Sequence, residues 1–452
     1  MNIVIVGMGE VGRHISGVLV GENHNVVIVD LNEQALSAAE ETIDAMVLKG
    51  HGANLDTLRE ANAGTADLFV AVSDNSEANM LAAIRAKKLG ATKTIARVSD
   101  PAYFESHRGI VAGMMGIDLV INPQALIALE MHKIVRSINA VAVEDFADNR
   151  IEMIQLPVED VTLAINRPLR DVKLPSNTLI AALIRNHELL VPGGDDAILP
   201  GDEILAVGRI DQIPQVEKLF KRERRKFTKR VVIVGGSLVG KNLAAALAED
   251  GIEVLLIDKD RDRCVELSHQ LQDVVILHGD GTDVHLLEEE RMDHIDAFVA
   301  VSGEDEVNLM ASLLAKDLGA DRVVAMVHKP DYGPIIERLG IDSFLSPRLE
   351  VAKQVLKYVR AGEVVGITPI LEGQGEFLEF IAPTDARIVG KPLKDVDFPK
   401  GANICAVVSQ RGALVPSGEY VIEPGDRVVV FTIPKNRRAV EKAFQKPRFG
   451  IL

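Results

Sequence analysis

The sequence has few cysteines and lacks the hydrophobic segments that would assign it to secreted or membrane-spanning classes. Its two cysteines, Cys264 and Cys405, lie at unrelated places, so no disulfide framework is predicted and a reducing cytoplasm fits. No apolar run reaches the roughly 18 residues that a membrane span requires. The opening MNIVIVG predicts a short strand that enters a glycine turn, without the basic and apolar regions of a secretory signal.

Positive charge and catalytic motifs are also scarce. The formal net charge of −16 argues against nucleic acid or anionic lipid as the main partner, so membrane association would have to run through another protein. No H-E-x-x-H, Cys/His metal cluster, Ser-His-Asp order or G-x-x-x-x-G-K-[ST] motif occurs. Metal-dependent hydrolysis, acyl transfer and phosphoryl transfer are therefore not indicated, although the hydrophobic content of 47% is ample for folded cores.

The chain does contain an internal repeat that runs through both halves. The segment NIVIVGMGEVGRHI near the N-terminus returns at position 231 as VVIVGGSLVGKNL, and the stretch 68–83 is matched by 297–312. Further on, RPLRDVKLP (167–175) is matched by KPLKDVDFP (391–399). Two copies of a nucleotide-binding unit, each followed by the same small module, are typical of a sensor. An enzyme more often pairs one cofactor domain with a different substrate domain.

The spacing of apolar runs predicts an α/β fold in each half. Near-continuous apolar strands alternate with helical stretches, as in a parallel sheet that is buried on both faces and doubly wound. Short strands with Gly, Pro and Asp turns then predict a small α+β module. We expect two Rossmann-like doubly wound parallel sheets at 1–122 and 229–346, each followed by a connecting helix and a small module at 123–222 and 347–452. The charged run KRERRKFTKR (221–230) is predicted to be a solvated linker, with a partner-docking patch as the alternative.

The first copy carries a complete G-x-G-x-x-G motif between a strand and a helix. Gly7 permits the tight turn, Gly9 lets the backbone approach a pyrophosphate, and Gly12 allows close helix–strand packing. The pyrophosphate would lie at the helix N-terminus, where free N–H groups favour anions. Asp30 ends the second strand and would accept the ribose hydroxyls, which favours NAD over NADP. The alternative is a glycine turn kept for packing alone.

The second copy departs from this motif. Ser237 stands where the second glycine is expected, and Met326 replaces the possible phosphate ligand Arg97. Asp258 remains at the ribose position, and Asp280 corresponds to His51 of the first copy. We therefore expect the first copy to dominate NAD(H) binding, with a shorter adenine nucleotide as the alternative ligand of the second.

These features together resemble a known family. The glycine motif, the Asp at the second strand end and the VAVS strand resemble the KTN/RCK domain, and the small modules resemble the TrkA-C domain. Their tandem order over essentially the whole chain is similar to the peripheral regulatory subunits of the Trk potassium-uptake system. The resemblance implies a cytoplasmic ring, a tetramer, that binds NAD(H) and ATP or ADP and gates a TrkH/TrkG-like membrane potassium transporter at the inner face of the cell membrane. The nucleotide-site residues that we expect are Gly7, Met8, Gly9, Glu10, Val11, Gly12, Asp30, His51, Ser73, Asp74 and Arg97, and Gly235, Gly236, Ser237, Leu238, Val239, Gly240, Asp258, Asp280, Ser302 and Gly303.

Other functions stay open as alternatives. A soluble NAD-dependent oxidoreductase would need a proton donor beside the nicotinamide, and the histidines do not form such a set. A regulatory subunit of a different potassium channel or antiporter is the other alternative. The acids Asp74, Glu304 and Asp305 after the strands could bind a cation, or they could be helix N-terminal acids that the helix dipole favours.

The helices that follow Pro123 and Pro347 carry apolar stripes. Leu126 in one and Val355 in the other are examples at helical spacing. These stripes either pair the two lobes or only cover their own sheets. In a closed assembly, a nucleotide would act by changing the population of two lobe arrangements, through unequal affinity for the two.

Overall fold

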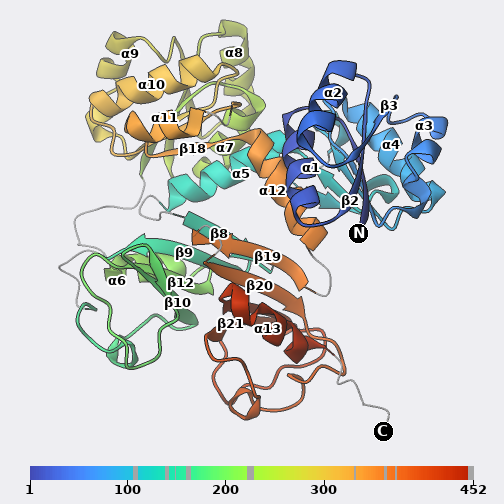
Figure 1. The fold of residues 1–452 in the computed structure, drawn as a ribbon. Helices are drawn as coiled ribbons and strands as arrows, with labels where there is room; N and C mark the ends of the chain where they lie inside the picture. Colours follow the sequence, from blue (N-terminus) through green and yellow to red (C-terminus); the bar gives the residue numbers. More distant parts are fainter. Residues whose placement is uncertain are drawn as a thin grey trace. The chain divides into compact units, whose positions relative to one another are not determined.

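The computed structural model describes residues 1–104, 110–137, 142–147, 149–158, 164–220, 229–329, 332–360, 364–371 and 374–445. The chain divides into two compact units, each of which contains one part of both repeats (Figure 1). The first unit is Met1–Arg136 with Thr228–Leu356, and the second is Ser137–Phe227 with Lys357–Leu452. The division into four domains at the expected boundaries stays a prediction, and the expected linker lies outside the described residues except for Lys229 and Arg230.

The first repeat begins with a sheet in the order β3-β2-β1-β4-β5-β7-β6. All strands but the edge strand β6 run parallel, and β6 pairs antiparallel with β7. Continuous apolar strands fit this sheet, because helices cover both of its faces. The strands are β1 (Asn2–Val6), β2 (Asn25–Asp30), β3 (Met46–Lys49), β4 (Leu68–Ala71), β5 (Lys93–Arg97), β6 (Ile110–Ala112) and β7 (Leu119–Ile121), and the helices are α1 (Glu10–Gly21), α2 (Glu33–Thr42), α3 (Leu55–Glu60) and α4 (Ser76–Leu89).

The second repeat builds the same sheet in the order β15-β14-β13-β16-β17-β18, and all of its pairings are parallel. The doubly wound α/β fold is therefore confirmed in both halves. The strands are β13 (Arg230–Val234), β14 (Glu253–Asp258), β15 (Val274–His278), β16 (Ala297–Ala300), β17 (Val323–Met326) and β18 (Ser343–Leu345), and the helices are α7 (Leu238–Glu249), α8 (Arg261–Gln270), α9 (Val284–Glu289), α10 (Asp305–Asp317) and α11 (Gly333–Arg338).

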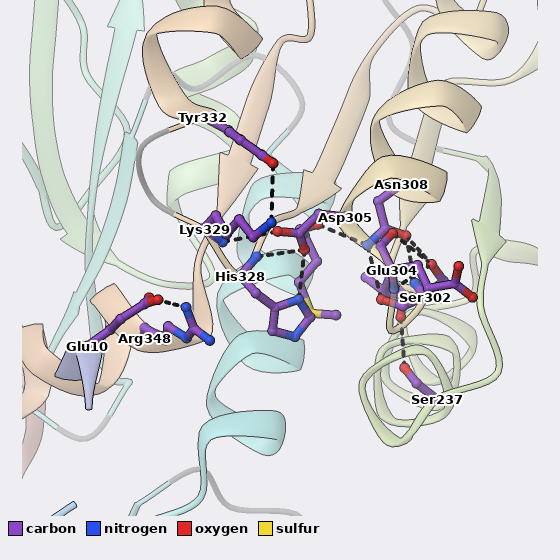
Figure 2. A network of polar contacts seen from close by, with 12 residues as sticks. Glu10, Ser237, Ser302, Glu304, Asp305, Asn308, His328, Lys329, Tyr332 and Arg348 are labelled. Atoms are coloured by element: carbon purple, nitrogen blue, oxygen red, sulfur yellow. Dashed lines mark hydrogen bonds and ion pairs between the residues drawn. The ribbon is translucent and has the colours of Figure 1, made fainter. Parts of the chain in front are cut away.

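The helix after each sheet contacts the first helix of the other repeat. Helix α5 (Pro123–Arg136) packs along α7, and Nε2 of His132 lies 2.8 Å from Oδ2 of Asp250, just beyond the end of α7. Helix α12 (Pro347–Arg360) begins beside α1, where Arg348 forms an ion pair with Glu10 (Figure 2). Helix α5 thus contacts the other repeat, but of its predicted stripe Leu126 is buried and Leu129 is 37% exposed. The pairing of the lobes through these stripes therefore stays a prediction.

The second unit contains two five-stranded antiparallel sheets, one from each repeat. Their strand orders are equivalent when one is read in reverse: β11-β10-β12-β9-β8 corresponds to β22-β21-β23-β20-β19. Both sheets contain a register shift at the same place, Ile180/Ala182 and Ile404/Ala406. The elements are β8 (Ala142–Phe146), β9 (Ile151–Pro157), β10 (Thr178–Arg185), β11 (Glu188–Leu190), β12 (Glu203–Arg209) and α6 (Ile213–Phe220), then β19 (Val364–Ile370), β20 (Gly375–Ile381), β21 (Ala402–Ser409), β22 (Gly412–Leu414), β23 (Arg427–Thr432) and α13 (Arg437–Phe444).

Each module has its own helix-covered core, and the two modules share a third. Phe444 of α13 stacks on Phe380 with ring centroids 3.9 Å apart. The shared core joins Phe146 of the first module to Phe377 and Phe431 of the second, with centroids 5.2 and 4.8 Å apart along that row. Within the described ranges, no helix has the length and apolar character to cross a bilayer.

Candidate nucleotide-binding loops

Two glycines of each loop are required by packing within the protein itself. Gly7 has a φ of +101°, and a Cβ at this residue would lie 2.6 Å from the backbone nitrogen of Ser73. A Cβ at Gly12 would lie 1.9 Å from the carbonyl oxygen of Gly7. Gly235 and Gly240 repeat both constraints in the second copy, so the two loops share one backbone design.

Gly9 is not required in that sense, because nothing lies within 4 Å of a Cβ built on it. It is the N-cap of α1, and no side chain among the described residues caps this helix. The N–H groups of a first helical turn lack partners inside the helix and favour an anion. The loop therefore keeps open space and unused donors together, and this is the arrangement that a pyrophosphate fits.

The second loop uses the corresponding space itself. Ser237 is the N-cap of α7, and its hydroxyl accepts a hydrogen bond from the Gly240 N–H at 3.3 Å and donates one to the Val301 carbonyl at 2.9 Å. One donor of the first turn is thus satisfied within the protein. A ligand at this loop would have to compete with that cap.

The carboxylates at the ends of β2 and β14 hold their loops in place. Oδ2 of Asp30 accepts from the Met8 N–H at 2.5 Å, and Oδ1 accepts from the Asn32 N–H at 2.7 Å. Asp258 makes the equivalent bonds to Gly236 and Asp260 at 2.5 and 2.8 Å. Each carboxylate oxygen has a further lone pair, so a ribose hydroxyl can still be accepted at this position.

His51 and Asp280 serve the same turn after the third strand of each sheet. Nδ1 of His51 accepts from the Ala53 N–H at 3.1 Å, and Oδ1 of Asp280 accepts from the Thr282 N–H at 2.9 Å. Either side chain provides the acceptor that closes the turn, which accounts for a histidine in one copy and an aspartate in the other. His51 also lines an open hollow of about 570 Å³ formed by the turn before α3 and by helices α3 and α4. The other lining residues are Ala53, Asn54, Leu55, Asp56, Arg59, Leu81 and Arg85.

The ends of β4 and β5 are joined by a buried asparagine that the sequence analysis missed. Oδ1 of Asn79 accepts from the hydroxyl of Ser73 at 2.6 Å, and its Nδ2 donates to the carbonyls of Ser73 and Arg97 at 2.8 and 2.9 Å. Asn308 makes the same bonds to Ser302 and to the Met326 carbonyl. The repeat carried the signal, since an Asn occurs at this position in both copies.

Arg97 is positioned by this cluster rather than left free. Its Nη1 lies 2.7 Å from Oδ1 of Asp74 and 3.3 Å from the Ser73 carbonyl. The structure thus brings three of the predicted site residues together at the strand ends. Asp74 is 98% exposed, so this ion pair is weak and Arg97 can exchange it for a ligand phosphate.

Each of the acids after the strands has a cationic or histidine partner. Besides Asp74, Glu304 lies 2.8 Å from the ammonium of Lys259, and the buried Asp305 lies 2.8 Å from Nδ1 of His328 (Figure 2). Gly303 has open space around its Cβ position, as Gly9 does. Among the described residues, no group of three or more His, Cys, Asp or Glu side chains is arranged to hold a metal ion.

Comparisons with known proteins agree with this architecture. The TrkA-N domain model matches residues 3–123 and 231–347, and the TrkA-C domain model matches residues 153–221 and 377–445. The chain is 37% identical over 453 residues to the Trk system potassium uptake protein TrkA homolog 1 of Methanosarcina mazei, covering 98% of this chain and 100% of that protein. It is 32% identical over 454 residues to the Trk system potassium uptake protein TrkA of Halomonas elongata, covering 98% and 99%.

Solved structures share the fold at lower identity. The GsuK channel bound to NAD has a TM-score of 0.61 and 18% identity, and the match covers 98% of this chain and 78% of the channel. The crystal structure of the GsuK RCK domain has a TM-score of 0.58 and 18% identity, with 98% and 94% covered. At this identity, the likeness establishes the fold alone.

Proposed function

Because the chain belongs to the TrkA family of Trk system potassium uptake proteins, we propose that it is a regulatory subunit of potassium transport, one that binds nucleotides and controls a membrane transporter. Full-length relatives named as potassium uptake proteins support the transport role. The observation that carries the nucleotide role is the open space and uncapped helix at Gly9, between two glycines that packing fixes.

The first repeat is the principal NAD(H) site in this proposal. The first-turn donors of α1 would hold the pyrophosphate, and Asp30 would accept the ribose hydroxyls. Ser73, Asp74 and Arg97 lie at the neighbouring strand ends, where ligands bind in doubly wound folds. The fold of a channel solved with NAD is compatible with this assignment.

The second repeat is a weaker site, or one for a shorter adenine nucleotide such as ADP or ATP. The Ser237 hydroxyl competes for the Gly240 donor, and Met326 supplies no cation where the first repeat has Arg97. Asp258, Asp280 and Ser302 keep the same places as their counterparts in the first repeat. The two repeats would then respond to different ligands.

Regulation would follow from a shift between two arrangements of the lobes. A ligand shifts such an equilibrium only as far as its affinities for the two states differ, with typical coupling of about 1–3 kcal/mol. We place the chain in a closed homo-oligomer, a tetramer, that lies in the cytoplasm against the inner face of a TrkH/TrkG-like transporter. A closed ring satisfies repeated interfaces without open ends.

Flux measurements test the proposal. Proteoliposomes that hold a candidate potassium transporter are assayed for rubidium uptake with and without this chain, at several concentrations of NADH and ATP. We expect nucleotide-dependent flux only when the chain is present. We also expect Gly9→Asp to weaken the response, because a carboxylate would face the pyrophosphate. An equal nucleotide response without the chain would reject the regulatory role.

A further inference from the structure

The nucleotide loop of the first repeat has a cation supplied by the second repeat. Arg348, in the first turn of α12, forms an ion pair with Glu10, which is the first residue of α1 and directly follows Gly9 (Figure 2). Both residues belong to the same compact unit. The chain positions of the two residues lie 338 apart, so the pairing is a property of the fold and not of local sequence.

Glu10 creates an electrostatic conflict at this loop. An acid in the first helical turn is favoured by the helix dipole when no ligand is bound. The same carboxylate repels a phosphate that approaches the first-turn donors, since like charges at short range oppose each other. A cation beside Glu10 would offset this repulsion when a phosphate binds at the loop.

Arg348 is suited to this role because its present pairing is weak. The side chains of Arg348 and Glu10 are 36% and 53% exposed, and exposed ion pairs contribute little to stability. A guanidinium also binds phosphate oxygens through two parallel hydrogen bonds, more strongly than a single neutral bond. A phosphate at the loop would thus compete well for Arg348.

The second repeat shows what the loop is like without this pair. Its residue equivalent to Glu10 is Leu238, and the residue of α5 equivalent to Arg348 is Gln124. Both charges are missing together, while the contact between the crossing helix and the first helix is kept, since α5 packs along α7. The second repeat thus packs its two helices without such a charge pair. The first repeat alone carries the pair, and it lies beside the open space at Gly9.

We propose that Arg348 is a ligand-binding residue of the first repeat and contacts the phosphates of the nucleotide bound there, so that binding is transmitted to α12. This inference rests on the proposed function, because it concerns the same nucleotide site. Helix α12 runs from the first compact unit into the second, whose part of this repeat begins at Lys357. Nucleotide binding in one repeat would then act on the connecting helix of the other repeat.

The test compares variants of the full chain that all carry one further substitution, which weakens binding at the second loop. Ser237→Asp places a carboxylate at the second loop and keeps a good N-cap, so the remaining nucleotide binding belongs to the first loop. In this background, Arg348→Gln and Glu10→Leu introduce the residues that the other repeat carries. Isothermal titration with NADH and with ADP gives the affinities, and thermal unfolding confirms that each variant is folded.

We expect Arg348→Gln to weaken nucleotide binding about tenfold, and Glu10→Leu to strengthen it several-fold. The double variant should return toward the affinity of the background. Arg338→Gln removes a positive charge from an exposed helix position in the same repeat and should change little.

Unchanged affinity in Arg348→Gln, or an equal loss in Arg338→Gln, would overturn the inference and leave the proposed function standing. If Arg348→Gln does not fold, unchanged affinity in Glu10→Leu overturns it instead. If the unmodified chain binds neither NADH nor ADP, the proposed function fails and the inference fails with it.

Discussion

Asp305 accepts two hydrogen bonds from His328 through one oxygen, since both the backbone N–H and Nδ1 of His328 lie 2.8 Å from its Oδ1 (Figure 2). Its other oxygen accepts from the Lys329 N–H at 3.1 Å. The first repeat joins the same two segments with neutral groups, because the Ser76 hydroxyl accepts from the Ser99 N–H at 3.0 Å. The second repeat has thus replaced a neutral link between the helix and the strand end with a charged one.

This difference predicts a pH-dependent loss of stability. Burial raises the pKa of Asp305, but the hydrogen bonds from His328 and Lys329 outweigh it and hold the pKa below the ordinary value of 3.8. A lowered pKa contributes stability that is present above pH 3.8 and lost as the pH falls through the folded-state value. We expect Asp305→Asn to lower the free energy of unfolding by about 1–3 kcal/mol at pH 7.

Urea unfolding from pH 7 downward measures this effect. The difference in free energy of unfolding between the unmodified chain and Asp305→Asn should stay constant near neutral pH. It should become smaller below pH 3.8. Ser76→Ala changes the equivalent position of the first repeat and should show no such dependence. A difference in free energy of unfolding that increases on acidification would contradict the lowered pKa of Asp305.

Asp30→Ala should weaken NADH binding by about 1.5–3 kcal/mol, because charge-assisted hydrogen bonds to the ribose are lost. Asp30 also holds the Met8 N–H, so the loop loses part of its support in this variant. Asp258→Ala removes the same support from the second loop and serves as the matched control. Titration calorimetry of the full chain compares them, and equal losses of NADH affinity would show that the first loop is not the principal site.

Exchanging Gly9 and Ser237 between the two loops should change how strongly each loop binds NADH. Gly9→Ser should reduce NADH binding, because the serine hydroxyl would cap α1 as Ser237 caps α7. Ser237→Gly should free the Gly240 donor at a stability cost of a few tenths of a kcal/mol. Binding stoichiometry with NADH and ADP is the measurement. Stronger NADH binding in Gly9→Ser would refute the role given to the open space.

The assembly prediction can be tested at exposed apolar residues that recur in both repeats. Leu81 on α4 and Met310 on α10 occupy equivalent positions and are 42% and 53% exposed. Charged substitutions at both, Leu81→Glu with Met310→Glu, should lower the mass of a closed oligomer in light scattering, since apolar residues are concentrated in interface cores. Leu339→Glu on another exposed site is the control. A stable monomer of the unmodified chain at micromolar concentration would count against the ring.

Much of the fold follows from the sequence because the repeat reports each element twice. The sequence predicts helices over 76–89 and 11–20. The structure has α4 at Ser76–Leu89, without change, and α1 at Glu10–Gly21, with one residue added at each end. Short apolar strands between glycine turns and helices leave few alternatives to a parallel sheet. The edge strand β6 was not predicted, because three residues carry too little periodicity to be recognised.

The site was predicted less completely than the fold. Motif spacing identified Gly9 and Asp30 as candidate ligand residues, and that role stays a prediction. The bonds from Asp30 to the loop were not predicted, because they depend on how the chain folds back after β2. Asn79 was visible only as an identical residue in two copies, without a motif to explain it. Arg348 could not be found from sequence, because its distance from Glu10 along the chain gives no local pattern.

The exchange of helices between the repeats has a consequence for how such a chain could arise. A protein with one repeat would expose the surface of its first helix that the helix of the other repeat covers here, and pairing with an identical molecule would cover it. In such a pair both loops are the same by necessity. Joining the two copies in one chain removes that constraint, since each loop then mutates alone. Ser237, Leu238 and Met326 stand where the first repeat has Gly9, Glu10 and Arg97, and only a chain that contains both copies can carry such differences between its two loops.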